Sequence, residues 1–360
     1  MTQTAPTMVG APSFSNLEYW ESRFQKDPSA FEWLLSPNRL DKHVLEALDA
    51  AASSSSPNPL SPQQPSIHHI GCGTSAMSFQ LRRLVDDPAQ VLNTDYSPAA
   101  VEIGRSREKE IFGDGGAEVV EQATRRRRGS ASMESSSSEL EEEDETQTRG
   151  DRQRRPSDAA ARRAGRESKT MRWRTIDLLS LADTAQLARD PPYPPFAVIV
   201  DKSTSDCISC VDDVAVTLPY ALQPVESSTP GTTAANPPTT MAQIHPLHLL
   251  AVHLAYHTRP GGRWLAVSYS GARFPFLPPY PDRADEGMLS DETVERGFVH
   301  PGRLWRLQSH EMIDSGGDEG KGEEGGKEGG GATVVVHRPR IMHHLYVLER
   351  TDLRLEMVGR

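Results

Sequence analysis

The chain has 360 residues, 25% of them charged, and a formal net charge of −11 at pH 7. This negative balance argues against a general binder of nucleic acid or of anionic membranes, and no apolar run approaches the length that spans a bilayer. Three cysteines are too few for a disulfide framework. Because the first residues lack a basic and apolar leader, we expect a soluble protein of the cytoplasm, with the nucleus as the alternative.

Parts of the chain have a composition that cannot bury enough apolar surface to offset chain entropy. We predict low-complexity, disordered insertions, which include an RRRR run and an ELEEEDE run, at residues 113–170, 223–243 and 314–332. The remainder suits one large domain with a single core over residues 16–350. Residues 1–15 are predicted to be a disordered N-terminus, and residues 351–360 a C-terminal tail.

The first ordered stretch, residues 17–35, is named here the aromatic segment. It gathers aromatic side chains in a chain that is otherwise poor in them, namely Tyr19, Trp20, Phe24, Phe31 and Trp33. Some of these share one face of a helix. Two interpretations stay open: an amphipathic helix that packs onto the core, or a lid whose aromatic faces line a ligand pocket. Apolar spacing predicts a further helix at residues 40–51.

A strand, a glycine turn and a helix are predicted over residues 67–84. The apolar run IHHI meets Gly71 and Gly73, which let the backbone turn sharply and present no Cβ to an approaching ligand. Thr74 or Ser75 can cap the helix that follows. Units of this kind open nucleotide-binding α/β domains, although the signal alone is weak.

Strands and helices alternate after this unit. Strands are predicted at residues 91–95, 171–177, 196–201, 263–269, 304–310 and 340–350, and helices at residues 96–112, 205–222 and 244–258. The run at 196–201 is apolar enough to be buried on both faces of a sheet. The pattern predicts an α/β fold with a mostly parallel sheet, helices on both faces and an antiparallel C-terminal hairpin.

The glycine turn alone does not identify the class of cofactor. The sequence GCGTSA at residues 71–76 satisfies the dinucleotide pattern with Asp95 about the expected distance downstream, so an NAD-binding domain is one interpretation. A carboxylate at the end of the second strand accepts ribose hydroxyls in either case, and Asp95 does not discriminate. Asp177, after the apolar Ile176 at the end of the third strand, suits an adenine amino group beside an apolar wall.

Short motifs follow one another along the chain in a recognisable order. They are YWESRF with a later tryptophan, at Tyr19, Trp20, Arg23, Phe24 and Trp33; GCGTSAMS, with Gly71, Cys72, Gly73, Thr74, Ser75, Met77 and Ser78; DYS at Asp95, Tyr96 and Ser97; RWRTID, with Arg172, Trp173 and Asp177; DKSTSD, with Asp201, Lys202, Ser203, Thr204 and Asp206; and PGGR at Pro260, Gly261, Gly262 and Arg263. In this order the chain resembles class I S-adenosylmethionine-dependent methyltransferases. More narrowly, it resembles the group that contains the lysine methyltransferases of eukaryotic elongation factor 1-alpha.

The resemblance implies a Rossmann-like, seven-stranded methyltransferase sheet and S-adenosyl-L-methionine as the cofactor. The glycines would admit its methionine part, Asp95 would hold the ribose, and the aromatic segment would lie over the sulfonium, where aromatic faces favour a cation. Lys202 would approach the cofactor at the end of the fourth strand. The cofactor-binding residues that it implies are Trp20, Phe24, Phe31, Gly71, Gly73, Asp95, Tyr96, Ile176, Asp177 and Lys202.

A protein lysine acceptor, with elongation factor 1-alpha as its candidate source, is likewise implied by the resemblance. Lys202, Asp201 and Asp206 are candidates for positioning the acceptor; the alternative for Lys202 is a structural ion pair with either aspartate. The segment departs from the group, because Asp201 replaces a glutamate, Ser203 a glycine and Ser205 an apolar residue. If Ser203 holds a positive φ, the serine costs on the order of a kcal/mol. Another acceptor, or an inactive cofactor-binding scaffold, stays open.

No metal site is expected from the sequence. The pair Cys207 and Cys210 lacks the further cysteines or histidines of a structural zinc site. His253 and His257 form HxxxH without the glutamate of a zinc-protease helix. Methyl transfer needs neither a metal nor a covalent nucleophile. The sequence leaves the oligomeric state open.

Overall fold

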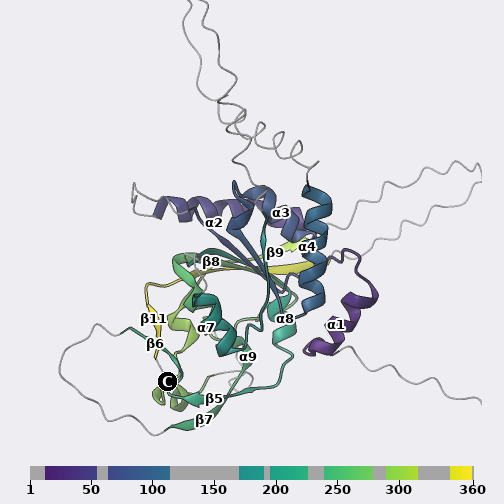
Figure 1. The fold of residues 1–360 in the computed structure, drawn as a ribbon. Helices are drawn as coiled ribbons and strands as arrows, with labels where there is room; N and C mark the ends of the chain where they lie inside the picture. The colour runs from purple at the N-terminus through teal and green to yellow at the C-terminus, as the bar shows by residue number, and fades with distance from the viewer. Residues whose placement is uncertain are drawn as a thin grey trace, which may run out of the picture.

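The protein is built on a seven-stranded sheet in the order β3-β2-β1-β4-β8-β10-β9 (Figure 1). The computed structural model describes residues 13–54, 64–113, 170–189, 195–225, 239–278, 289–314 and 341–358. The strands of this sheet are β1 (Ile67–Ile70), β2 (Val91–Asp95), β3 (Arg172–Thr175), β4 (Phe196–Lys202), β8 (Thr258–Ser268), β9 (Trp305–Asp314) and β10 (Met342–Arg350). From β3 to β8 the neighbours are parallel, whereas β10 is antiparallel to both β8 and β9. The predicted Rossmann-like sheet with an antiparallel end is confirmed.

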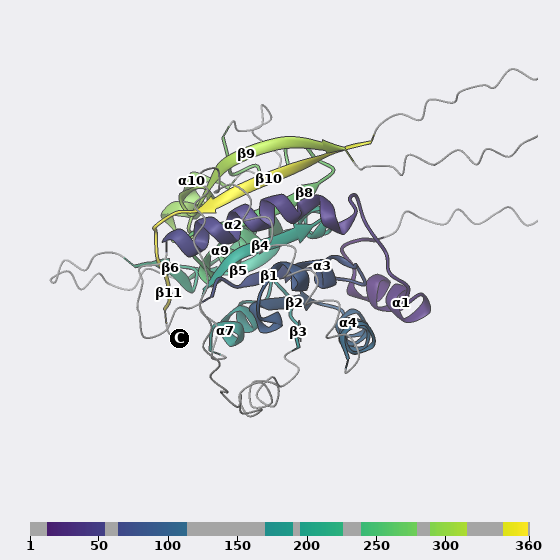
Figure 2. The ribbon, with the colours of Figure 1, turned by 90° about the horizontal axis from the view of Figure 1, so that it is seen from above.

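Helices cover both faces of this sheet, as Figures 1 and 2 show. One face carries α2 (Asp41–Ser54), α3 (Met77–Leu84) and α4 (Pro98–Phe112), and the other carries α7 (Leu181–Arg189), α8 (Thr204–Ile208) and α9 (Pro246–His257). Alternate residues of β4 supply both cores, because successive strand side chains point to opposite faces. Val198 and Val200 pack in the core that includes α2, and Ile199 packs in the core that includes α9.

The aromatic segment lies beside the sheet rather than in it. Its helix α1 (Leu17–Lys26) begins at Asn16, whose side chain accepts a hydrogen bond from the Glu18 N–H at 2.7 Å. Trp20 and Phe24 are its buried residues, and they pack against Ala100 of α4. The segment therefore packs against α4, the helix that follows β2.

The helix predicted at residues 205–222 is wrong. Only α8, at Thr204–Ile208, is helical there, and β5 (Val214–Leu218) follows and pairs antiparallel with β7 (Thr240–Ile244). Val216 and Leu218 are buried while Thr217 between them is not, which is the period of a strand. Pro219 follows at once and would leave a helix without a backbone donor.

Short strands also occur outside the main sheet, at both ends of the predicted loop 223–243 and in the predicted tail. Strand β6 (Leu222–Pro224) pairs antiparallel with β11 (Leu355–Met357), and β7 begins at Thr240. Most of the predicted insertions, with the RRRR and ELEEEDE runs, lies outside the described residues. Within the described ranges, no helix combines the length and apolar character that crossing a membrane requires.

A buried carboxylate joins α4 to β3 and α3. Glu108 is 3% exposed, and its two oxygens accept hydrogen bonds from Met171 N at 2.7 Å and from Trp173 Nε1 at 2.8 Å. Arg82 Nε lies 3.2 Å from the same carboxylate, and the Arg82 guanidinium lies 3.8 Å from the centre of the Phe112 ring. The charge of Glu108 is therefore balanced, and its hydrogen bonds fix the start of β3.

We expect Glu108→Ala to lower the free energy of unfolding by about 3 kcal/mol, because it leaves Arg82 as a half-buried charge without its partner. Urea unfolding followed by circular dichroism measures the loss. Glu102→Ala on the same helix is the matched control: its side chain is 69% exposed and lies 3.7 Å from Arg105, so we expect a change below about 0.5 kcal/mol. Equal effects of the two substitutions would contradict the role of Glu108.

Candidate functional site

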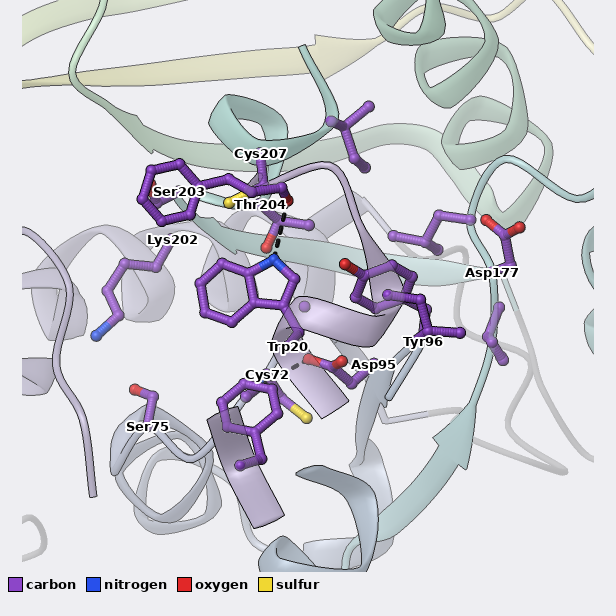
Figure 3. Close-up of a pocket in the computed structure, with 18 of the residues that line it drawn as sticks. Trp20, Cys72, Ser75, Asp95, Tyr96, Asp177, Lys202, Ser203, Thr204 and Cys207 are labelled. Carbon is purple, nitrogen blue, oxygen red and sulfur yellow. Dashed lines mark hydrogen bonds between the residues drawn. The ribbon is translucent and has the colours of Figure 1, made fainter. Parts of the chain in front are cut away.

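A cavity of about 530 Å³ opens at the carboxyl ends of β1, β2, β3 and β4, where open α/β sheets bind ligands. Every cofactor-binding residue expected from the sequence lines it: Trp20, Phe24, Phe31, Gly71, Gly73, Asp95, Tyr96, Ile176, Asp177 and Lys202. Figure 3 shows Lys202 and Asp177 on opposite sides of the cavity, with Asp95 and Tyr96 between them. Of the three positioning candidates, Lys202 lines the cavity, whereas Asp201 and Asp206 are not part of its lining.

The glycine turn owes its two glycines to different causes. Gly71 and Gly73 have φ of 53° and 50°, a region that residues with a Cβ rarely adopt. A Cβ on Gly71 would also overlap the side chain of Thr204, whereas a Cβ on Gly73 would meet Phe24 at an ordinary 3.4 Å. Thr204 Oγ1 donates to the Ile70 carbonyl at 3.0 Å. Gly71 is therefore required by the close packing of the turn against α8, and not only by access for a ligand.

Asp95 is the central polar group of the cavity. It is 6% exposed; one carboxylate oxygen accepts from Gly73 N at 2.8 Å and the other from Ser97 N at 2.9 Å. Burial raises the pKa of Asp95 to about 6, against the lowering effect of these N–H groups. Each oxygen can accept a further hydrogen bond, so the ionised carboxylate can bind a pair of ligand hydroxyls.

The far side of the cavity combines an apolar wall with an exposed acceptor. Ile176 is buried and Asp177 is exposed. Asp177 Oδ1 accepts from Leu179 N at 2.9 Å, and Asp177 N donates to Asp183 Oδ2 at 2.8 Å. Tyr96, half-buried, lines the cavity between this side and Asp95 (Figure 3). A planar base with an amino group fits this combination.

The aromatic segment packs onto α4 and also lines the cavity. Trp20 stacks on Phe24 with ring centres 5.6 Å apart, and its indole N–H donates to the Phe14 carbonyl at 2.9 Å. Phe31 meets Trp33 edge-on at 5.2 Å. These rings form an apolar wall of the cavity.

Two glutamates of the aromatic segment connect it to the helices that follow β1 and β2, and neither contact was predicted from the sequence. Glu21 binds the Ser97 hydroxyl and accepts from Ala99 N at 3.2 Å, at the start of α4. Glu32 accepts from the Ser75 hydroxyl and from Ala76 N at 2.5 Å, at the start of α3. Carboxylates are stabilised at helix N-termini, where backbone N–H groups lack partners. No local spacing predicts such contacts, because the partners lie far apart in the chain.

Lys202 pairs with Glu32 and not with the aspartates considered from the sequence. Its Nζ also lies 3.4 Å from the Leu35 carbonyl. The ion pair of Lys202 with Asp201 or Asp206 that the sequence offered is therefore wrong. Its actual partner comes from a segment 170 residues away in the chain.

Asp201 and Asp206 hold the backbone around the end of β4. Asp201 accepts from Thr204 N at 2.9 Å, from Ser205 N at 3.2 Å and from Trp264 Nε1 at 3.2 Å. Burial raises the pKa of Asp201 to about 6. Both carboxylates are occupied by structural donors, those of Asp206 being Arg273 Nη2 at 2.7 Å, Ser203 Oγ at 2.9 Å, Ser268 Oγ at 2.5 Å and Tyr269 N at 3.3 Å.

Ser203 holds the positive φ on which its predicted cost depended. Its φ of 68° and ψ of 8° lie in the left-handed region. Its hydroxyl donates to Asp206 Oδ2 at 2.9 Å. A hydrogen bond to a charged group contributes about 1.5 kcal/mol or more, which offsets a backbone cost of about 1 kcal/mol. The serine is thus accommodated by a partner that a glycine would not use.

His69 also lines the cavity and was not expected from the sequence. Its Nδ1 lies 3.0 Å from Ser78 Oγ and 3.1 Å from Asn93 Oδ1. Burial lowers the pKa of His69 to about 4, so the ring is neutral at pH 7. Among the described residues, no cluster of histidine, cysteine, aspartate and glutamate is placed to hold a metal ion.

The sequence was also compared with those of known proteins. No family model matches the chain. Over 205 residues it is 27% identical to methyltransferase srdJ of Neurospora crassa, and this match covers 57% of the chain and 58% of that protein. The chain thus spans little more than half the length of this curated relative.

The solved structures that resemble the chain do so at low sequence identity and low TM-score. One is the N-methyltransferase NodS from Bradyrhizobium japonicum in complex with S-adenosyl-L-homocysteine, at 11% identity and a TM-score of 0.36, covering 94% of this chain and 98% of that one. Another is geranyl diphosphate C-methyltransferase from Streptomyces coelicolor, at 10% identity and a TM-score of 0.36, covering 96% and 100%. The strand order and the antiparallel end of the sheet are themselves those of the class I S-adenosylmethionine-dependent methyltransferase fold.

Proposed function

We propose that the protein is an S-adenosylmethionine-dependent methyltransferase. The observation that carries the proposal is the cavity at the carboxyl ends of the parallel strands, where the glycine turn, Asp95 and Asp177 come together. Asp95 retains acceptor capacity for the ribose hydroxyls, and Asp177 for the adenine amino group. The partial match to a curated methyltransferase supports the same activity.

The residues at the other end of the cavity fit the amino-acid part of this cofactor. Lys202 supplies a buried ammonium there. Thr74 Oγ1 is buried in the cavity wall and has no hydrogen-bond partner among the described residues. A buried hydroxyl without a partner is costly, and a carboxylate ligand would provide one.

The cofactor supplies a methyl group bound to a positively charged sulfur that is already an activated leaving group. The protein then has to align the acceptor with that methyl group and exclude water. Trp20 and Phe24 line the cavity with apolar rings, which favours the exclusion of water. Their ring faces also favour a cation.

We propose a protein lysine as the acceptor, with elongation factor 1-alpha as its first candidate. The co-linear motifs from Leu17 to Leu348 support this acceptor. The geometry adds that Trp33 meets Tyr269 edge-on at 6.4 Å where β8 ends, and Tyr269 is 54% exposed. Exposed aromatic faces beside the cavity suit the aliphatic stem and the amine of a lysine.

We expect Asp95→Asn to weaken binding of S-adenosyl-L-homocysteine about 100-fold, because two hydrogen bonds to a charged acceptor are replaced by weaker ones. Isothermal titration calorimetry measures the affinity, and circular dichroism checks that the variant is folded. Unchanged affinity would refute the ribose role of Asp95. Binding of NAD by the wild type without binding of S-adenosyl-L-homocysteine would overturn the proposed function itself.

The affinity of the wild type should fall as pH decreases below about 6. Ligand hydroxyls need the ionised carboxylate of Asp95, whose pKa is about 6 in the free protein, so a proton competes with the ligand below that value. We expect constant affinity above pH 7 and a loss approaching tenfold per pH unit toward pH 5. Asp95→Asn should lack this fall. A fall that persists in the variant would assign it to another group, such as Asp201, and refute the prediction.

Incubation with methyl-labelled cofactor tests activity and acceptor together. Recombinant elongation factor 1-alpha should be labelled by the wild type and at least about 100-fold more slowly by Asp95→Asn at subsaturating cofactor. Mass spectrometry should then locate the methyl group on lysine. Label on other lysate proteins alone would replace the proposed acceptor, and no label despite cofactor binding would favour the scaffold.

A further inference from the structure

Glu32 joins three parts of the protein through one carboxylate. It accepts from Ala76 N at 2.5 Å, and its oxygens lie 3.1 and 2.9 Å from Ser75 Oγ. Its Oε2 also binds Lys202 Nζ. The side chain of Lys202 is 4% exposed and that of Glu32 is 28% exposed. A glutamate of the aromatic segment therefore provides the countercharge of a buried lysine.

The pair marks one end of the cavity. In Figure 3, Lys202 and Ser75 lie on the side opposite to Asp177, and Asp95 lies between the two sides. Lys202 and Ser75 line the cavity, whereas Glu32 is not part of its lining. Any effect of Glu32 on a ligand is therefore exerted through the two residues that it holds.

The chemistry of this end suits a zwitterion. An ammonium has three donors; Glu32 and the Leu35 carbonyl take two of them, and the third is available to a ligand. The buried hydroxyl of Thr74 lies in the same lining without a partner among the described residues. Lys202 and Thr74 can therefore both donate to the carboxylate of an α-amino acid group. Because Glu32 balances the charge of Lys202, this end of the cavity suits a ligand group without net charge.

We propose that Glu32 is a positioning residue for the amino-acid end of the cofactor, which it serves by fixing the Lys202 ammonium and the Ser75 hydroxyl at that end of the cavity. The inference rests on the proposed function, because it takes S-adenosylmethionine as the ligand. It concerns the methionine part of that ligand only. The ribose and the base would be held elsewhere, by Asp95 and by the wall around Ile176.

The electrostatics of Lys202 agree with this role. Burial lowers the pKa of Lys202, and the charge of Glu32 opposes that effect. Among the described residues, His69 on β1 also interacts electrostatically with Lys202; its own pKa lies at about 4, so it is neutral at pH 7. Without Glu32, the lysine would be a buried charge with no countercharge, and it would present its donors less firmly to a ligand.

Two ligands separate this role from a merely structural one. S-adenosyl-L-homocysteine contains the amino-acid end, and 5′-methylthioadenosine lacks it while keeping the ribose and the base. Glu32→Gln retains an oxygen that can accept from Ala76 N and Ser75 Oγ, so it removes the charge and keeps the helix contact. We expect it to weaken S-adenosyl-L-homocysteine about tenfold more than 5′-methylthioadenosine in calorimetry, as for the loss of one charge-assisted contact.

Glu21→Gln is the matched control, since it changes the equivalent carboxylate at the start of α4, which binds Ser97 and Ala99 but no lysine. It should affect both ligands equally. Lys202→Met should reproduce the selective loss, and combining it with Glu32→Gln should add little, because the pair acts as a unit. Equal losses of both ligands in Glu32→Gln, or no loss, would overturn the inference. Failure of the wild type to bind either ligand would instead overturn the proposed function.

Discussion

The cavity depends on how the aromatic segment is attached to the sheet. Within the described residues no strand pairing joins the two, and the attachment includes ring packing and two carboxylates, Glu21 and Glu32, placed at the starts of the helices that follow β2 and β1. Each carboxylate accepts from a serine hydroxyl and from a backbone N–H that would otherwise lack a helical partner. The aromatic segment thus contacts both the β1–α3 and the β2–α4 units. It also places Trp20 and Phe24 beside the glycine turn in the lining of the cavity.

Both non-glycine residues that have positive φ among the described residues lie at or beside this attachment. Gly71, Gly73, Ser203 and Leu34 all have positive φ, and Leu34 sits in a turn closed by Leu35 N on the Trp33 carbonyl at 2.7 Å. For residues with a Cβ such conformations cost on the order of 1–3 kcal/mol and persist only where surrounding contacts enforce them. Such contacts are present here, because Asp206 accepts from the Ser203 hydroxyl and Lys202 donates to the Leu35 carbonyl. Strain and polar contacts are concentrated where a ligand would bind.

The sequence predicted what depends on local pattern and missed what depends on distant partners. Buried strands such as β4 and the glycine turn show in the residues themselves, because burial and positive φ restrict the residue types allowed. The prediction of a helix at 205–222 was wrong because Val216 and Leu218 alternate with less buried residues, which is the pattern of a strand. Glu32 could not be anticipated, since its partners Ser75 and Lys202 lie 43 and 170 residues away.

The placement of the aspartates limits how an amine acceptor could lose its proton. An amine attacks only when neutral, and a nearby carboxylate is the usual means of proton removal. Asp206 is held by Arg273 and by three further donors, and Asp201 by three donors of its own. Neither lines the cavity. A lysine acceptor would therefore not pass its proton to Asp201 or Asp206. Burial against the apolar wall of the aromatic segment would lower the pKa of the amine, so that it would release its proton to solvent before it attacks.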